Sequence, residues 1–271
     1  MHSSGTWDPT TYLRFAGERA RPFAELLSRV DADTPRVVVD LGCGDGSATA
    51  TLAQRWPGAR VTGVDSSPAM LAAAAAHAVP GRLEFVAGDL RDWRPAEPVD
   101  VLVSNAALHW APGHGPLVAR WAGDLAPGGW LALQVPGNQA APTHALLADL
   151  VADPRWSARL APGDDTVLSP AAVLEPTGYL DVLTAAGLSG DVWETTYLHE
   201  LSGDDPVLGW VSGTVLRPVL ARLSPADGEE LTTEYAAALR AAYPARPDGT
   251  TVLPFRRVLA VGHRPAELSA G

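Results

Sequence analysis

Three aspartates could do binding chemistry, because each closes an apolar segment and the first precedes closely spaced glycines. Asp40 ends a run of valines, and Gly42, Gly44 and Gly46 follow it. Glycine lets a ligand approach the backbone where a Cβ would clash. A strand, a glycine turn and a helix in this order are typical of nucleotide sites. An acid beside the turn would repel a pyrophosphate but suits a ligand with a cationic end. A glycine-rich turn without a ligand is the alternative interpretation.

The second and third acids extend this pattern. Asp65 closes the next apolar segment, and an acid about 20 residues after such a turn accepts hydrogen bonds from ribose hydroxyls. Asp89 closes the third segment. One such acid could be a helix cap, but three acids that close successive segments favour a nucleoside site.

Strands that alternate with helices must position these acids. Apolar segments predict strands at 36–41, 60–64, 82–87, 99–104 and 128–135, and helical patterns lie at 46–56, 67–77 and 114–124. The alternation predicts an α/β fold, with a mostly parallel sheet covered by helices on both faces. Two late segments, 191–201 and 251–263, alternate in polarity and predict an antiparallel pair that closes the sheet.

The remaining segments look helical with Pro and Gly breaks, and they define the expected domain limits. We expect an N-terminal helical lid at 1–35, a cofactor-binding core at 36–135, a helical insertion at 136–190, closing strands at 191–263 with a helical cap insertion at 203–249, and a tail at 264–271. In open α/β sheets, ligands bind at the carboxyl ends of the strands. Both insertions are therefore expected above those ends.

Composition narrows the class of protein. The 271 residues carry a net charge of −11, which argues against nucleic acid as a partner. No apolar run approaches the roughly 18 residues that cross a membrane, and the polar N-terminus predicts no secretory signal. The single cysteine, Cys43, excludes an internal disulfide. No histidine pair has metal-ligand spacing on a predicted helix. These features predict a cytoplasmic enzyme without a metal, and they leave its oligomeric state open.

The glycine turn is similar to the first motif of class I S-adenosylmethionine-dependent methyltransferases. Residues 40–46 read D-L-G-C-G-D-G, and residues 125–131 give the L-x-P-G-G-x-L turn that is also typical of that superfamily. The resemblance implies a Rossmann-like fold and S-adenosyl-L-methionine as cofactor, with S-adenosyl-L-homocysteine as product. Asp65 would hold the ribose, Met70 would lie on the adenine face, and Asp89 would accept from the adenine amino group. The implied cofactor-binding residues are Asp40, Gly42, Gly44, Asp65, Met70, Asp89, Leu90, Asn105 and Arg19.

More specific motifs make the chain resemble the trans-aconitate 2-methyltransferase family. They lie at 7–22, 105–110, 134–138, 142–144, 193–199 and 216–218. The family pattern N-A-S-L-Q-W reads N-A-A-L-H-W here, so His109 replaces a glutamine. The resemblance implies methyl transfer to a carboxylate of a tricarboxylate, giving a monomethyl ester. Related acids remain open as weak substrates.

A tricarboxylate that approaches a protein of net negative charge needs local arginines, which bind carboxylates bidentately. The candidate substrate-binding residues are Tyr12, Gln134, Asn138, His144, Arg217, Arg256 and Arg257. Neighbours on a strand face opposite ways, so we expect either Arg256 or Arg257 to reach the site and the other to be solvated. Arg19 could bind substrate instead of the cofactor's carboxylate.

A carboxylate is already ionised at neutral pH, so we assign no catalytic acid or base. Tyr12, His109 and Trp110 are candidates for lining the methyl group, and Trp7 and Trp210 could help exclude water. Two other functions stay open. A methyltransferase acting on a hydroxyl or an amine would need a general base, for which His109 is the candidate. A non-catalytic cofactor-binding protein would need no second insertion.

Overall fold

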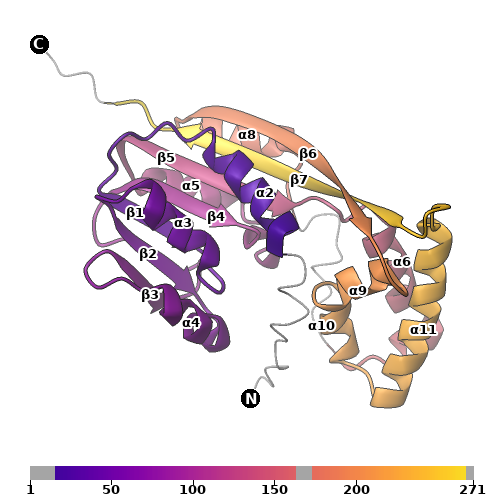
Figure 1. The fold of residues 1–271 in the computed structure, drawn as a ribbon. Helices are drawn as coiled ribbons and strands as arrows, with labels where there is room; N and C mark the ends of the chain where they lie inside the picture. The colour runs from indigo at the N-terminus through magenta and orange to yellow at the C-terminus, as the bar shows by residue number, and fades with distance from the viewer. Residues whose placement is uncertain (1–15, 163–172, 267–271) are drawn as a thin grey trace, which may run out of the picture. The chain divides into compact units, whose positions relative to one another are not determined.

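The computed structural model describes residues 16–162 and 173–266 of the chain. These residues contain a seven-stranded sheet in the order β3-β2-β1-β4-β5-β7-β6 (Figure 1). The strands are β1 (Val37–Leu41), β2 (Arg60–Asp65), β3 (Leu83–Ala87), β4 (Val99–Asn105), β5 (Leu125–Pro136), β6 (Ser189–Leu201) and β7 (Thr251–His263). Strands β1 to β5 pair in parallel, and β7 runs antiparallel to β5. The predicted α/β sheet is confirmed.

The inner strands form where the sequence is continuously apolar. All five residues of β1 are buried, as expected of a parallel strand covered on both faces. Strand β5 begins earlier than predicted, because Leu125 already pairs with Val99. The next pair is Val101 with Trp130, so the register shifts across the turn that contains Gly128. The sequence pattern predicted this turn and a strand from residue 128, but not the strand residues that precede the turn.

Helices cover both faces of the sheet (Figure 1). Helices α2 (Ala16–Leu27) and α3 (Ser47–Arg55) bury Phe23, Leu26 and Leu52 against one face, called here the α2/α3 face. Helices α5 (Gly115–Gly123) and α8 (Pro176–Ala185) bury Trp121 and Leu183 against the other. Helix α4 (Pro68–Ala74) and the short helices η1 (Ala75–His77) and η2 (Leu108–Trp110) complete this part of the chain.

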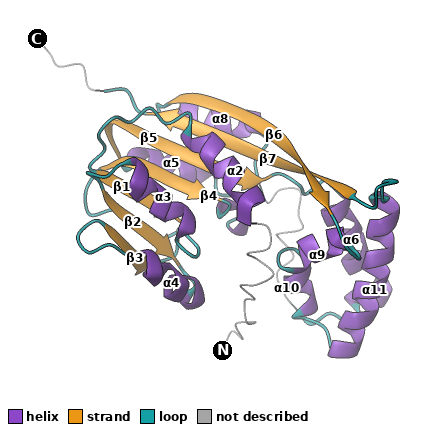
Figure 2. Ribbon diagram, viewed as in Figure 1, coloured by secondary structure: helices purple, strands orange, loops and turns teal. Residues whose placement is uncertain are grey.

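The described residues divide into two compact units. A sheet unit comprises 19–136, 173–195 and 257–266, and a helical unit comprises 16–18, 137–162 and 196–256. The helical unit contains α6 (Pro142–Ala152), α7 (Pro154–Ser157), α9 (Pro206–Ser212), α10 (Leu216–Leu220) and α11 (Pro225–Ala242) (Figure 2). Its core includes Trp210, Leu216 and Tyr235. Both predicted insertions contain helices, although α8 belongs to the sheet unit. The domain limits drawn from the sequence stay a prediction.

None of the helices in the described ranges combines the length and apolarity needed to span a bilayer. The cytoplasmic location stays a prediction.

Candidate functional site

The glycine turn after β1 has one closed position and one open position. Gly42 has φ +81°, and a Cβ added there would lie 2.3 Å from the Cβ of Ala107. Gly44 has φ +56°, and a Cβ added there would meet no described atom within 4 Å. Both positions favour glycine because L-residues rarely adopt positive φ. Gly42 therefore serves packing, whereas Gly44 borders the open space that a ligand could fill.

Asp40 lies at the end of β1 with only 2% of its surface exposed. Its Oδ2 accepts a 2.6 Å hydrogen bond from Thr49 on α3, and its Oδ1 is buried without a donor among the described residues. Burial raises the pKa of Asp40 to about 6; Thr49 opposes this shift, and the nearby charge of Asp65 adds to it. A buried acceptor that lacks a donor is costly. A ligand with a cationic or N–H group would satisfy it.

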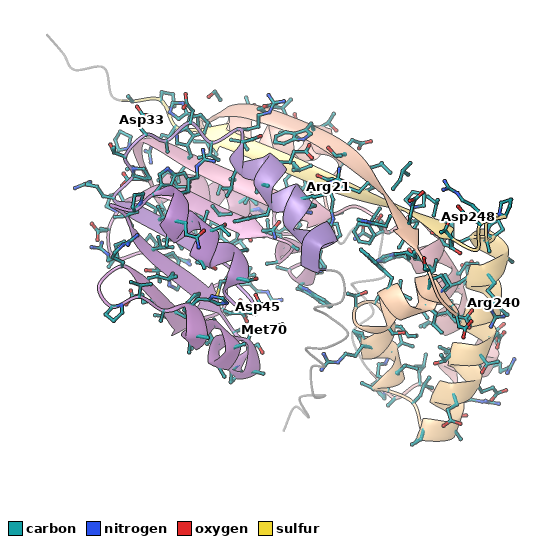
Figure 3. All side chains as sticks on the ribbon, viewed as in Figure 1. Arg21, Asp33, Asp45, Met70, Arg240 and Asp248 are labelled. Carbon is teal, nitrogen blue, oxygen red and sulfur yellow. The ribbon has the colours of Figure 1, made fainter. Side chains whose placement is uncertain are left out.

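Asp65 joins the glycine turn to the start of α4. Its Oδ2 accepts from the N–H of Gly44 at 2.9 Å, and its Oδ1 accepts from the N–H of Ser67 at 2.8 Å. A carboxylate has about four lone-pair positions. Two acceptor positions therefore remain for a ligand such as a ribose. Met70 lies on α4 and is half-buried (Figure 3).

Asp89 follows β3 and is held by the residue two positions later. Its Oδ1 accepts from the N–H of Arg91 at 2.8 Å, and its Oδ2 pairs with the Arg91 guanidinium at 3.2 Å. The same guanidinium donates to the backbone oxygen of Trp110 at 2.8 Å. Arg120 donates to the backbone oxygens of Arg91 and Leu90. This turn is therefore fastened to η2, a role for Arg91 that no sequence pattern indicated.

The carboxyl ends of β4 and β5 carry buried amide groups. Asn105 pairs in register with Gln134, whose side chain is 1% exposed. Asn105 Oδ1 and Gln134 Nε2 lack hydrogen-bond partners among the described residues. The next residue, Ala106, has φ +52°, a strained conformation for a non-glycine residue and one that clusters at functional sites. An alanine at this position carries no pattern that would predict the strain.

Only some of the residues proposed to line the methyl group lie within the described part of the chain. The rings of His109 and Trp110 lie 4.8 Å apart around η2, and Trp110 is 48% exposed. Tyr12 and Trp7 lie outside the described residues. Arg19 belongs to α2, but its side chain is also outside the described part. Trp210 is buried in the apolar core of the helical unit.

Four substrate candidates belong to the helical unit. The side-chain amide of Asn138 makes two hydrogen bonds with the backbone of Arg256. Its expected role as a hydrogen-bond donor to the substrate therefore competes with a role in holding this backbone. His144 lies on α6, where burial lowers its pKa to about 4 and keeps it neutral at pH 7. Arg217 lies half-buried on α10. Two cavities of this unit, of about 430 and 470 Å³, are lined by neither His144 nor Arg217.

The two adjacent arginines of β7 differ in exposure. Arg257 is 7% exposed, and Arg256 is only partly exposed. The expectation that one of them reaches the site while the other is solvated stays a prediction. The Arg256 guanidinium donates to the backbone oxygen of Gly137 at 3.4 Å.

The described residues bring the cofactor candidates together at one edge of the sheet. Asp65 and Asn105 end β2 and β4, Asp40 is the penultimate residue of β1, and Asp89 follows β3 within two residues. Ligands bind at this edge in open α/β sheets. The same residues contain no group of three side chains able to hold a metal ion.

Comparisons with known proteins show what the chain is similar to. Residues 38–129 match the family model of a methyltransferase domain. A trans-aconitate 2-methyltransferase from Streptomyces avermitilis is 55% identical over 267 residues, which cover 96% of this chain and 98% of the relative. A trans-aconitate 2-methyltransferase from Mycolicibacterium gilvum is 51% identical, covering 94% of this chain and 98% of that protein.

Solved structures share the fold at low identity. The YcgJ protein from Bacillus subtilis has a TM-score of 0.60 at 14% identity, over 91% of this chain and 99% of its own. A geranyl diphosphate methyltransferase in complex with GPP and sinefungin has a TM-score of 0.51 at 16% identity, over 90% and 78%. At such identities the likeness concerns the fold alone.

Proposed function

This chain belongs to the trans-aconitate 2-methyltransferase family, and from that membership we propose that it methylates a carboxylate of trans-aconitate. S-adenosyl-L-methionine is the methyl donor, and the products are a monomethyl ester and S-adenosyl-L-homocysteine. The observation that carries the proposal is the 55% identity over 96% of the chain. That range includes the helical unit as well as the methyltransferase domain.

The residues at the sheet edge fit the cofactor. Asp40 offers a buried acceptor for the amino group in the methionine part of the cofactor, since Asp40 Oδ1 has no donor among the described residues. Gly44 leaves open space where a side chain would stand. Asp65 has acceptor positions left for the ribose hydroxyls. Asp89 and the backbone of Leu90 would form hydrogen bonds with the adenine ring. Asn105 ends the neighbouring strand. Each role is part of the proposal.

When bound, S-adenosyl-L-methionine supplies a sulfonium methyl group that an ionised carboxylate can attack directly. With the cofactor held by Asp40, Gly44 and Asp65, a carboxylate oxygen would form the new C–O bond as the methyl–sulfur bond broke and left its electron pair on sulfur. No proton is transferred, so no residue needs to act as a base. The protein must orient the acid and exclude water, and orientation can lower a barrier by roughly 7–11 kcal/mol in favourable cases. Trp110, His109 and Tyr12 are proposed to line the methyl group.

We propose that the carboxylates of the substrate are bound by one cationic and one neutral hydrogen-bond donor of the helical unit. The chain has a net charge of −11, so a trianion must be held by close arginine–carboxylate pairs rather than by long-range attraction. Arg217 of the helical unit is one proposed partner. His144 is neutral at pH 7 and could donate one hydrogen bond.

The test is methyl transfer from labelled cofactor to a panel of di- and tricarboxylates, together with the trimethyl ester of trans-aconitate. We expect label in a base-labile ester of trans-aconitate and none in the triester, which lacks a free carboxylate. Label in a base-stable product from a hydroxyl or amine compound would support the rival function. Cofactor binding without turnover on any acid would favour a non-catalytic protein.

His109 separates carboxylate chemistry from base-dependent chemistry. If the nucleophile is a carboxylate, His109→Gln should retain most activity, and the rate should reach a plateau above pKa values near about 4–5. His77→Gln is the matched control, because His77 is exposed on η1. His109 would be identified as a base if the rate collapsed in His109→Gln but not in His77→Gln, and if the rise in the pH–rate profile at about pH 6.5 were lost.

A further inference from the structure

The α2/α3 face of the sheet carries polar residues on four neighbouring strands. Asp40 pairs in register with Val103, and Asn105 pairs with Gln134. Pro136, two residues after Gln134, pairs with Arg257. Paired residues share a face, and so do alternate residues of one strand. Asp40, Asn105, Gln134 and Arg257 therefore all lie on one face.

The apolar neighbours confirm which face this is. Val103, Ala132 and Leu259 belong to the cluster formed with α2 and α3. Ala132 is two residues before Gln134, and Leu259 pairs directly with Gln134. The polar residues thus continue the rows of the α2/α3 face toward the carboxyl ends of β4 and β5. All of them belong to the sheet unit.

Gln134 is the residue that points to a missing ligand group. Its side chain is 1% exposed, and Nε2 has no acceptor among the described residues. A buried donor without an acceptor is costly, so a ligand that supplies an oxygen would remove a penalty that the free protein carries. Arg257 is 7% exposed and keeps its positive charge at any relevant pH. Diagonal neighbours across a strand pair lie roughly 7–8 Å apart, within reach of two long side chains.

We propose that Gln134 and Arg257 form a carboxylate-binding subsite for a carboxylate of the acid substrate that is not methylated. The proposal rests on the proposed function. Gln134 would donate one N–H to a carboxylate oxygen, and the Arg257 guanidinium would pair with the same group. Arg256 is excluded from the subsite, because it faces the other side of β7 and its guanidinium donates to Gly137.

The cofactor also carries a carboxylate, but the spacing of the strands favours the substrate. Asp40 and Arg257 lie three strands apart, or roughly 14 Å at a spacing of about 4.8 Å. The amino and carboxylate groups of one amino acid are attached to the same carbon. If Asp40 holds the amino group, the carboxylate beside it stays near β1 and β4. Arg257 is then too far from that carboxylate to bind it, and we assign Arg257 to a different acid.

The experiment compares Gln134→Met, Arg257→Gln and Arg256→Gln in the full chain. We expect the first two variants to raise KM for trans-aconitate by at least about tenfold. Calorimetric affinity for S-adenosyl-L-homocysteine should stay within about twofold of wild type. Arg256→Gln should keep KM close to wild type. Because both subsite residues would bind one carboxylate, the double variant should lose less than the product of the two single losses.

A second readout does not depend on turnover. In the presence of S-adenosyl-L-homocysteine, trans-aconitate should raise the melting temperature of wild type and Arg256→Gln, but much less that of Gln134→Met. If Arg257→Gln does not fold, Gln134→Glu gives the same test, since a second carboxylate of similar size should repel the substrate.

The outcomes are distinguishable. Unchanged KM in Gln134→Met and Gln134→Glu would overturn the subsite while leaving the proposed function intact. Weakened binding of S-adenosyl-L-homocysteine in these variants would assign the subsite to the cofactor's carboxylate and overturn the assignment to substrate. Wild-type protein that methylates no acid of the panel would instead reject the proposed function.

Discussion

The side-chain amide of Asn138 pairs with both backbone groups of Arg256. Oδ1 accepts the N–H of Arg256 at 2.8 Å, and Nδ2 donates to its carbonyl oxygen at 3.0 Å. The Gly137 N–H donates to the same carbonyl at 3.0 Å. A side chain thus extends the pairing of β5 with β7 by one step beyond Pro136 and Arg257. Asn138 is 2% exposed, so the pairing is protected from water.

The first prediction is that Asn138→Ala destabilises the fold. Removing the amide leaves the backbone N–H of Arg256 without its partner, which should lower the free energy of unfolding by about 1–3 kcal/mol. Urea denaturation measures this loss. Asn138→Asp keeps the acceptor but puts a carboxylate oxygen against the carbonyl oxygen of Arg256, so it should also destabilise the fold. Equal midpoints for wild type and Asn138→Ala would show that the pairing does not contribute to stability.

Asn138 also shows what sequence reasoning could and could not reach. The strands of the core were predictable because a parallel strand buried on both faces reads as a continuous apolar run, as β1 does. The carboxyl edge was predictable because an acid lies at or within two residues of the end of each of the first three strands. The partner of Asn138 is 118 residues away, and no local pattern encodes such a contact. An amide in a family motif was therefore assigned to the substrate.

Two further contacts could not be predicted from the sequence for the same reason. Thr49 reaches back from α3 to Asp40, and Arg91 joins the turn after β3 to η2. Each depends on how separate elements pack, whereas the pattern of a single segment gives only its own secondary structure. The positive φ of Ala106 has no signal at all in an alanine.

The second prediction concerns Asp65. Asp65→Ala should weaken the binding of S-adenosyl-L-homocysteine by about tenfold or more, because the ribose hydroxyls lose an acceptor and Gly44 loses the partner of its N–H. Isothermal titration calorimetry measures the affinity. Asp33→Ala is the control, since Asp33 is an exposed acid in the loop before β1 (Figure 3). Wild-type affinity in Asp65→Ala would remove this residue from the site.

The third prediction is a pH dependence set by Asp40. Burial raises its pKa from 3.8 to about 6. Between about pH 4 and 6 the folded protein therefore holds more protons at this group than the unfolded chain does. By linkage, the contribution of Asp40 makes stability fall as pH rises through this window. Two pKa units correspond to about 3 kcal/mol.

Asp40→Asn should remove that contribution while keeping an acceptor for Thr49. The difference in unfolding free energy between Asp40→Asn and wild type should then increase in favour of the variant from about pH 4 to 6 and level off above it. Denaturation at a series of pH values measures the difference. A difference that stays constant across the range would mean that Asp40 does not carry a raised pKa.

The fourth prediction concerns Arg217 of the helical unit. If Arg217 pairs with a carboxylate of the substrate, Arg217→Ala should raise KM for trans-aconitate by at least about tenfold and leave affinity for S-adenosyl-L-homocysteine nearly unchanged. Arg246→Ala is the control, because Arg246 pairs with the exposed Glu200 in the same unit. A loss of cofactor affinity as large as the rise in KM would instead make α10 a part of cofactor binding or of packing.

The last prediction separates the two roles of the glycine turn. Gly42→Ala and Gly44→Ala both place an alanine at positive φ, which costs of order 1–2 kcal/mol. In Gly42→Ala the new Cβ also lies 2.3 Å from the Cβ of Ala107, so the protein must shift and its melting temperature should fall further. In Gly44→Ala the new Cβ meets no described atom within 4 Å. Stability should fall only by the backbone cost, whereas cofactor affinity should fall by at least about tenfold, because the methyl group occupies space needed by the ligand.

Gly81→Ala provides the matched control, since Gly81 has φ +73°, is exposed, and also has open space around an added Cβ. It should show the same loss of stability as Gly44→Ala with wild-type cofactor affinity. If Gly44→Ala and Gly81→Ala bind S-adenosyl-L-homocysteine equally well, the open space at Gly44 is solvent rather than the cofactor site.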